Sequence, residues 1–357
     1  TLSARAGSFG TWETTLEAGG RTRSGEAFGG VVATLATSDG FMDKGYDMKD
    51  TLVKTGMALG DDHLLGFKFS YHDNEADISY RGLLLADYRA GAAYNPAPDD
   101  QYLTDRRAFD VNHQWTIGAN ATLTSLVYWS DITRDYWRYD VNTPASNAAG
   151  RWVYTDTLTG NNRSFERFGA ESRLAVTHRL FGLDNETEIG VRMMREESND
   201  TRIPATRAAD RTGINDRHIQ DSAESVAAYV QNRFAVSDRL AVTPGIRGEA
   251  YQQTRKILTG AAGAESTDNV EVMPGVGATY DILQDAQIYG GLYRAFSPAS
   301  NGVALDGLTD QQLEGERSDN YEIGLRGVSG RVNYEVALFR MDFDNQVVTG
   351  NSDPTLS

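Results

Sequence analysis

The sequence predicts an all-β fold, a transmembrane up-and-down antiparallel β-barrel. The first observation is that connectors between runs of alternating polar and apolar residues switch regularly between very short and long polar stretches. The short connectors lie at residues 60–63, 118–121, 237–238 and 328–330. Barrels of bacterial outer membranes have this asymmetry, with brief periplasmic turns and longer extracellular loops.

The second observation is a period of two within the expected strands. Between residues 240 and 251, Leu240, Val242, Ile246 and Ala250 alternate with Thr243, Arg247 and Glu249. Residues 65–72 and 332–338 repeat the pattern. Since successive side chains of a strand point to opposite faces, one face is expected to meet lipid and the other a polar lumen.

A soluble β-sandwich or propeller could show the same alternation. The expected strands are longer than the ~5–6 residues typical of soluble proteins, and no repeat recurs at a fixed period. Aromatic residues near expected strand ends, where a membrane-interface girdle would place them, are Tyr128, Trp129, Tyr136, Trp137, Tyr289 and Tyr293. These features favour the membrane barrel.

The strand count predicts a partial barrel. The runs between connectors give about 15 strands, whereas bacterial single-chain barrels close with an even number. The first run begins near Leu2, the last ends near Val348, and a final long loop is expected from Thr349. We therefore expect residues 1–357 to form one barrel domain that is a fragment of a larger barrel.

Composition narrows the class of function. The chain has a formal net charge of −16 and no cysteine, which argues against nucleic acid as a partner and excludes disulfides and thiolate metal sites. A few local arginines could still bind a small anion.

No stretch approaches the ~20 apolar residues of a membrane helix. No nucleophile elbow, zinc motif or phosphate loop is present, so the chain is not expected to be an enzyme and no catalytic residue is assigned.

Several segments resemble a known family. The stretches AGSFGT (6–11), VTPGIR (242–247) and RSDNYEIG (317–324) resemble barrel strands of TonB-dependent outer-membrane receptors. The stretches YHDNEAD (71–77), GL (82–83), ADY (86–88) and ALFRMDFDNQ (337–346) are similar to the ferric dicitrate receptors of that family.

The resemblance implies a location in a Gram-negative outer membrane and about 15 of the 22 strands of such a barrel, without its plug and C-terminal strands. It implies a ferric citrate or similar ferric carboxylate ligand and, as partners, outer-membrane lipid and the TonB complex. It places ligand contacts at Arg134, Arg163 and Arg217, and at Asn351 where the family has glutamine. No cofactor is expected, because citrate itself would hold the iron.

The residues themselves are consistent with these positions. We expect Arg134 to end a strand, Arg163 to close the long loop that follows, and Arg217 to lie in the next loop. An arginine can donate two parallel hydrogen bonds to one carboxylate, although many loop arginines only pair with neighbouring acids at the surface. The five histidines, His63, His72, His113, His178 and His218, are dispersed in the sequence and predict no metal site.

Other functions remain open from sequence. A receptor for another siderophore or for haem would have aromatic-lined loops and dispensable arginines. A passive porin-like or structural barrel would lack a plug. A soluble glycan-binding β-domain is the weakest alternative, and it would fold without detergent.

Overall fold

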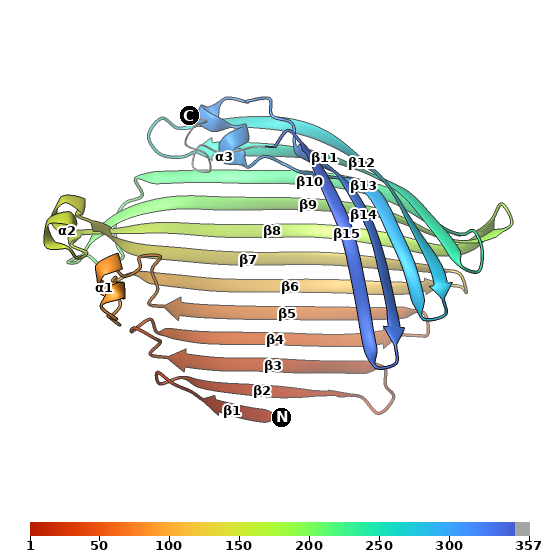
Figure 1. The fold of residues 1–357 in the computed structure, drawn as a ribbon, viewed down its shortest axis with the longest axis horizontal. Coiled ribbons are helices and arrows are strands. Elements are labelled where there is room, and N and C mark those ends of the chain that lie inside the picture. The colour runs from red at the N-terminus through yellow and green to blue at the C-terminus, as the bar shows by residue number, and fades with distance from the viewer. Residues whose placement is uncertain (347–357) are drawn as a thin grey trace.

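The computed structural model describes residues 1–346 of the chain, and within them the fold is one antiparallel sheet of 15 strands in sequence order (Figure 1). The predicted all-β, up-and-down architecture is confirmed. The strands are β1 (Leu2–Ala6), β2 (Trp12–Arg21), β3 (Ala27–Ser38), β4 (Tyr46–Leu59), β5 (His63–Ala76), β6 (Gln101–Ile117), β7 (Ala121–Val141), β8 (Tyr154–Leu180), β9 (Leu183–Thr206), β10 (Arg217–Ala235), β11 (Leu240–Ile257), β12 (Gly263–Leu283), β13 (Ala286–Ser297), β14 (Glu316–Ser329) and β15 (Val332–Asp344). Short helices α1 (Leu85–Arg89), α2 (Thr143–Ala149), α3 (Asn301–Ala304) and η1 (Asp306–Leu308) lie in the connectors.

The connectors alternate between the two ends of the sheet, but the predicted contrast in length holds only in part, because the loops 7–11, 39–45 and 258–262 have five to seven residues. One end of the sheet has the turns 22–26, 60–62, 118–120, 181–182, 236–239, 284–285 and 330–331, and the other has the loops 7–11, 39–45, 77–100, 142–153, 207–216, 258–262 and 298–315. Strands β8 and β9 have 27 and 24 residues, far more than the ~9–11 that cross a bilayer. The sheet therefore continues beyond the membrane on the loop side, which the sequence interpretation had treated as loop.

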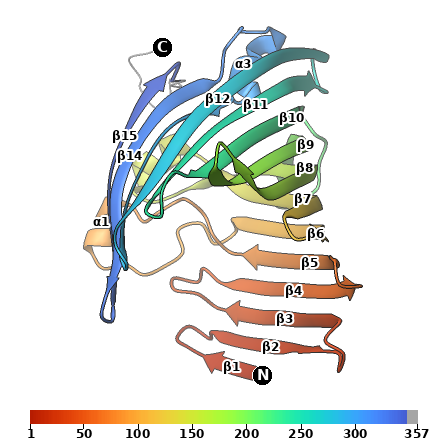
Figure 2. The ribbon, with the colours of Figure 1, turned by 90° about the vertical axis from the view of Figure 1, so that its right-hand side faces the viewer.

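The sheet curls about its strand direction, so that it has a concave and a convex face (Figure 2). Residues paired directly across strands share a face. Arg192 on β9 reaches Glu249 on β11 at 3.2 Å across the intervening β10. Side chains two strands apart come this close more easily on the concave side of a sheet, so we assign this pair to the concave face. We call this charged side the inner face, and the opposite side, with exposed Val226, Ile246 and Val270, the outer face.

The sheet does not close among the described residues, because β1 and β15 each pair with one neighbour only. The last strands cross in front of the sheet in Figure 1. Strand β12 pairs with β13 only from Gly275 toward the turn, and beyond that point Arg317 reaches Glu271 at 2.7 Å. Among the described residues, no helix combines the length and the hydropathy needed to cross a bilayer.

The aromatic girdle was predicted wrongly for most of its members. By the alternation along their strands, Tyr128, Tyr136, Tyr289 and Tyr293 lie on the inner face. Trp137 is 4% exposed and packs with Tyr139, Leu158 and Ala205. By the same alternation Trp129 and Trp137 lie on the outer face, Trp129 beside Phe109 and Phe168, but the burial of Trp137 removes it from a lipid-facing girdle. Proximity to a strand end had been counted without the face, although adjacent residues point to opposite sides.

The loop 77–100 is anchored by one buried carboxylate, Asp100, which is 1% exposed. Its side chain accepts hydrogen bonds from Arg81 Nη1 at 2.9 Å, from the Ser79 hydroxyl at 2.6 Å and from the Tyr139 backbone N–H at 3.0 Å. Arg81 is therefore part of the scaffold, because its charge is held by a buried acid.

Further contacts tie this loop to its neighbours. Trp152 Nε1 donates to the Gly82 carbonyl at 3.0 Å, and the Tyr154 hydroxyl donates to the Pro96 carbonyl at 2.6 Å. The Asn95 amide donates to the Asp43 carbonyl at 3.2 Å. The loops 39–45, 77–100 and 142–153 thus form one connected rim at the loop end of the sheet.

We predict that Asp100→Ala frees the loop 77–100, because it leaves the Arg81 charge buried without a partner, a change that costs about 3–5 kcal/mol in buried ion pairs. Limited proteolysis should cut this loop at least tenfold faster (~1.4 kcal/mol) while the heat-modifiable gel mobility of the barrel is unchanged. The matched control is Asp99→Ala, whose partner Arg207 is half exposed and whose loss should have little effect. Equal cleavage rates for the two variants would contradict the anchoring role of Asp100.

Candidate functional site

The three arginines predicted as ligand contacts lie on one face of the sheet near its loop end. Arg134 on β7 pairs directly with Arg163 on β8, and Arg163 pairs with Asp200 on β9. Arg217 begins β10 and pairs with Arg202, two residues further along β9. Alternation places all of them on the inner face, so a ligand entering from outside would meet them together.

None of the three predicted local environments is as expected, since Arg217 is the first residue of β10 and not part of a loop. Arg163 lies inside β8, and Arg134 is seven residues from the end of β7, so neither is in a loop or at a strand terminus. The stretch that ends at Arg163 was expected to be a loop, but residues 154–163 are regular strand and pair with residues of β9. Strand backbones hold the guanidinium groups in a fixed register, which a loop would not.

Asp200 connects two of the three arginines. Arg163 Nε donates to its Oδ2 at 2.8 Å, and Arg217 Nη2 donates to its Oδ1 at 2.6 Å. The carboxylate is about one-quarter exposed. An incoming carboxylate must therefore compete with Asp200 for these two arginines. Sequence reasoning missed Asp200, since only the register between β8, β9 and β10 brings it between them.

On the same face Arg106, Arg134 and Arg138 form no ion pair with a carboxylate among residues 1–346, unlike Arg167, which pairs with Glu196. Arg134 lies 5.7 Å from the centre of the Phe165 ring, and Arg138 lies 4.6 and 4.8 Å from the rings of Tyr80 and Tyr136. Arg106 on β6 pairs with Ile132, diagonally next to Arg134. We call Arg106, Arg134, Arg138, Arg163 and Arg217 the mouth arginines.

The mouth arginines form a cationic region in an acidic chain. Within the described part of the protein, Asp200 is the one carboxylate that their side chains contact. The buried Nε atoms of Arg138 and Arg217 have no hydrogen-bond partner there, which is unusual for buried donors. The adjacent Arg202 is different, because its two hydrogen bonds to Asp216 neutralise it and hold the pKa of that loop carboxyl below its usual range.

Tyrosines border the cationic region. Tyr136 meets Tyr80 and Tyr102 edge to face, with centroid distances of 6.1 and 5.8 Å, and its hydroxyl accepts a hydrogen bond from the Tyr80 backbone N–H at 3.0 Å. The loop 77–100 thereby brings an aromatic ring over the strand that carries Arg134 and Arg138. The site combines cations with flat apolar surface.

A cavity of about 340 Å³ opens directly below Arg134 and Arg163. Its inner-face lining includes Ser130, Phe165, Arg167, Glu196 and Asp221, and Asn301 of α3 closes one side. The Asn301 amide donates to the Ser222 and Thr254 carbonyls at 3.0 and 2.9 Å. The loop 298–315 is thus fixed to β10 and β11 beside the mouth arginines, and the site is concave.

The fourth predicted ligand contact and the five histidines remain to be placed. Asn351, like Thr349 and Val348, lies outside the described residues. Two of the five histidines, His63 and His113, lie together, with 3.0 Å between Nδ1 and Nε2, but near the turn end and on the outer face. No group of three or more metal-ligating side chains occurs in the described part of the chain.

Comparisons with known proteins agree with this architecture. Residues 51–357 match a family model described as TonB dependent receptor-like, beta-barrel. The chain is 22% identical over 389 residues to the ferric-pyoverdine BN7/BN8 receptor of Pseudomonas putida, covering 97% of this chain and 47% of that protein. The ferripyoverdine receptor of Pseudomonas aeruginosa is 28% identical over 150 residues, 40% of this chain and 17% of that protein.

Solved structures are similar in fold. The unliganded ferric citrate transporter FecA superposes with a TM-score of 0.81 at 18% identity, covering 97% of this chain and 50% of that one. The ferripyoverdine receptor of Pseudomonas aeruginosa bound to ferripyoverdine gives 0.76 at 17% identity, covering 99% and 50%. The chain spans about half the length of the first-named relative and of both solved structures.

The family match covers most of the chain, and the sheet, its alternating connectors and its two faces are those expected of an outer-membrane β-barrel. Members of this family are receptors and transporters, and the homologues are receptors of Gram-negative outer membranes. The chain therefore belongs to the TonB-dependent receptor β-barrel family and is located in the outer membrane.

Proposed function

We propose that this chain belongs to an outer-membrane receptor that binds ferric citrate, or a similar ferric carboxylate chelate, at the mouth arginines for TonB-energised uptake. The observation that carries the proposal is the set of five inner-face arginines near the loop end, of which only Arg163 and Arg217 contact a carboxylate, Asp200, among the described residues. In a chain of net charge −16, such a local reversal of sign favours an anionic ligand.

The chemistry of the ligand fits the geometry. The surface of ferric citrate is made of carboxylate oxygens, and a guanidinium group matches a carboxylate in shape and charge. Each charge-assisted hydrogen bond contributes roughly 1.5–3 kcal/mol. Arg134 is free to make such bonds, whereas Arg163 and Arg217 must first loosen from Asp200. The iron is cargo held by its chelator, and the protein needs no resident cofactor.

A second ligand is supported by a separate observation. Tyr80, Tyr102 and Tyr136 offer aromatic edges and faces beside the arginines, and two of the similar proteins are named as pyoverdine receptors. An anionic siderophore with a flat aromatic group could stack there while its acidic groups meet Arg134 and Arg138. In this alternative the arginines are still the binding site, but the ligand is a different ferric chelate.

Transport would follow the family's mode of action. The ligand binds between the extracellular rim and a plug, and the TonB complex of the inner membrane supplies the energy that rearranges the plug. The described residues supply the barrel wall and the rim. The outer face would contact membrane lipid throughout this cycle.

The first prediction is that Arg134→Ala/Arg163→Ala/Arg217→Ala weakens binding of the ferric chelate at least ~100-fold, about 2.7 kcal/mol. Calorimetric titration of the complete gene product with ferric citrate, iron-free citrate and ferric pyoverdine measures this change and identifies the chelate. Arg239→Ala, in a periplasmic turn, is the control and should bind as the parent does. Tight binding that survives the triple change would refute the site, and no binding of ferric citrate by the parent would refute that ligand.

The second prediction concerns Asp200. Asp200→Asn removes the charge that holds Arg163 and Arg217 and keeps a side chain of the same size. An anionic chelate should then bind about tenfold more tightly, because it no longer displaces a competing carboxylate. Asp238→Asn, in a turn at the far end, changes the net charge equally and should have no effect. Weaker binding by Asp200→Asn would show that Asp200 itself contacts the ligand.

A further inference from the structure

The cavity below the mouth arginines differs in chemistry from the mouth itself. Its inner-face side chains form two rows that follow the strand pairing. The first row is Ile132, Phe165, Ser198 and Asp221, and the second is Ser130, Arg167, Glu196 and Ala223. The first row is two residues, or about 7 Å of strand, from the row that holds Arg134, Arg163 and Asp200. A ligand bound at the mouth therefore presents its lower side to the cavity.

Hydrogen-bond acceptors predominate among the polar groups of this cavity. Arg167 is the one guanidinium among its inner-face lining residues, and it is occupied by an ion pair with Glu196. Asp221 adds a second carboxylate, and the hydroxyl groups of Ser130 and Ser198 offer lone pairs. The mouth thus offers donors to a ligand, whereas the cavity beside it offers acceptors.

Asp221 lacks a hydrogen bond although it is largely buried. Its side chain is about one-quarter exposed, and its Oδ1 atom is buried without a hydrogen-bond partner in the described part of the chain. Its ion-pair partner Arg255 has Nη1 at 3.7 Å from Oδ2, too far for a hydrogen bond. That Nη1 lies against α3, where a Cβ added to Gly302 would be 2.6 Å from it. A buried carboxylate oxygen without a donor is costly.

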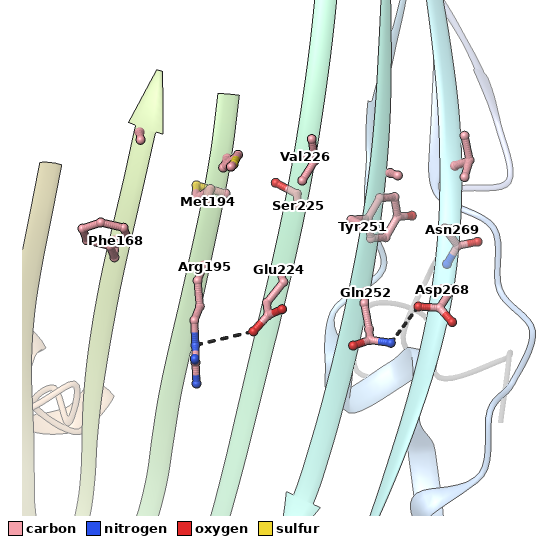
Figure 3. Close-up of a pocket in the computed structure, with 14 residues that line it drawn as sticks. Phe168, Met194, Arg195, Glu224, Ser225, Val226, Tyr251, Gln252, Asp268 and Asn269 are labelled. Atoms are coloured by element: carbon pink, nitrogen blue, oxygen red, sulfur yellow. Dashed lines mark hydrogen bonds and ion pairs between the residues drawn. The ribbon is translucent and has the colours of Figure 1, made fainter. Parts of the chain in front are cut away.

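This condition is not shared by the acids on the outer face of neighbouring strands. Asp268 accepts a hydrogen bond from Gln252 at 2.8 Å, and the side chain of Glu224 is 61% exposed beside Arg195 (Figure 3). Neighbouring side chains or solvent satisfy these carboxylates. The unpaired oxygen of Asp221 is therefore a local property of the cavity, and it calls for a donor.

A primary ammonium group meets this need. It donates three hydrogen bonds and carries a positive charge, so it can serve Asp221 and the two serines together. A carboxylate of the chelate would be repelled by Asp221 and Glu196, and a hydroxyl group supplies only one donor. Ile132 and Phe165 offer apolar surface to the methylene stem of an amine arm.

We propose that the ferric chelate bound by this receptor carries a primary amine, which enters the cavity and donates to Asp221, Ser130 and Ser198. The inference rests on the proposed function, since the mouth arginines must hold the carboxylates of the same ligand. It narrows the substrate class from ferric carboxylate chelates in general to those with an amine arm. The last torsion of an aspartate side chain is broad, so a small rotation brings either carboxylate oxygen of Asp221 to the amine.

The test compares three iron complexes by calorimetric titration of the complete gene product at neutral pH and fixed ionic strength. They are ferric citrate and the ferric complexes of two citrate amides, one with an aminoethyl arm and one with a hydroxyethyl arm. We expect the aminoethyl complex to bind about tenfold more tightly than the hydroxyethyl complex, because hydrogen bonds between charged groups are the stronger ones. Asp221→Asn keeps an acceptor but removes the charge, and it should bring this ratio to about one.

Glu265→Gln is the matched control. Glu265 lies on the inner face of β12, opposite Arg255 and two strands from Asp221, and it does not line the cavity. The substitution changes the net charge by the same amount and should leave the preference for the aminoethyl complex intact. Heat-modifiable gel mobility confirms that each variant is folded.

The outcomes separate the inference from the proposed function. Binding of ferric citrate, together with equal affinities for the two amide complexes, would overturn the inference and leave the proposed function standing. A preference for the amine that survives Asp221→Asn would overturn the assignment of the amine to this cavity. Failure of all three complexes to bind would refute the proposed ligand class, and the inference with it.

Discussion

The structure depends on one constraint, the alternation of side chains along strands that pair in a continuous antiparallel register. Once β7 to β12 are paired, every residue of those strands belongs to a face, and each face has cross-strand rows. Arg134 and Arg163 become neighbours because of this register. So do Met193 and Val226 on the opposite side. A slip of one residue in a single strand would move its charged groups into lipid.

The same constraint explains what the sequence could predict. Alternation is a local property, so the strand from Leu240, the two faces and the order of short and long connectors follow from the residues alone. Chemistry that depends on pairing does not follow, because the partner is set by register. Asp200 is 37 residues from Arg163 and 17 from Arg217, and no local pattern links them. The aromatic girdle was wrong for a related reason, since Tyr128 and Tyr136 were assigned by their position in the sequence without regard to face.

Strand length was the other source of error. The polar stretch that contains Arg163 has the composition of a loop, yet it pairs residue by residue with β7 and β9. Outside the bilayer a strand needs no apolar face, so the hydrophobic signal that marks strands disappears while the backbone pairing continues. The consequence is functional, because arginines on a paired sheet are held in fixed positions and less ordering is needed when a ligand binds.

Because each strand directs neighbouring side chains to opposite faces, the roles of the inner and outer faces can be tested separately. Strand β8 directs Arg163 and Phe165 inward and Phe168 and Ala170 outward, and β9 directs Asp200 inward and Arg195 outward. Substitutions a few residues apart on one strand therefore act on opposite sides of a sheet that is one backbone thick. In the proposed function the inner face would bind by charge, and the balance of charge there would be set by how many arginines Asp200 occupies.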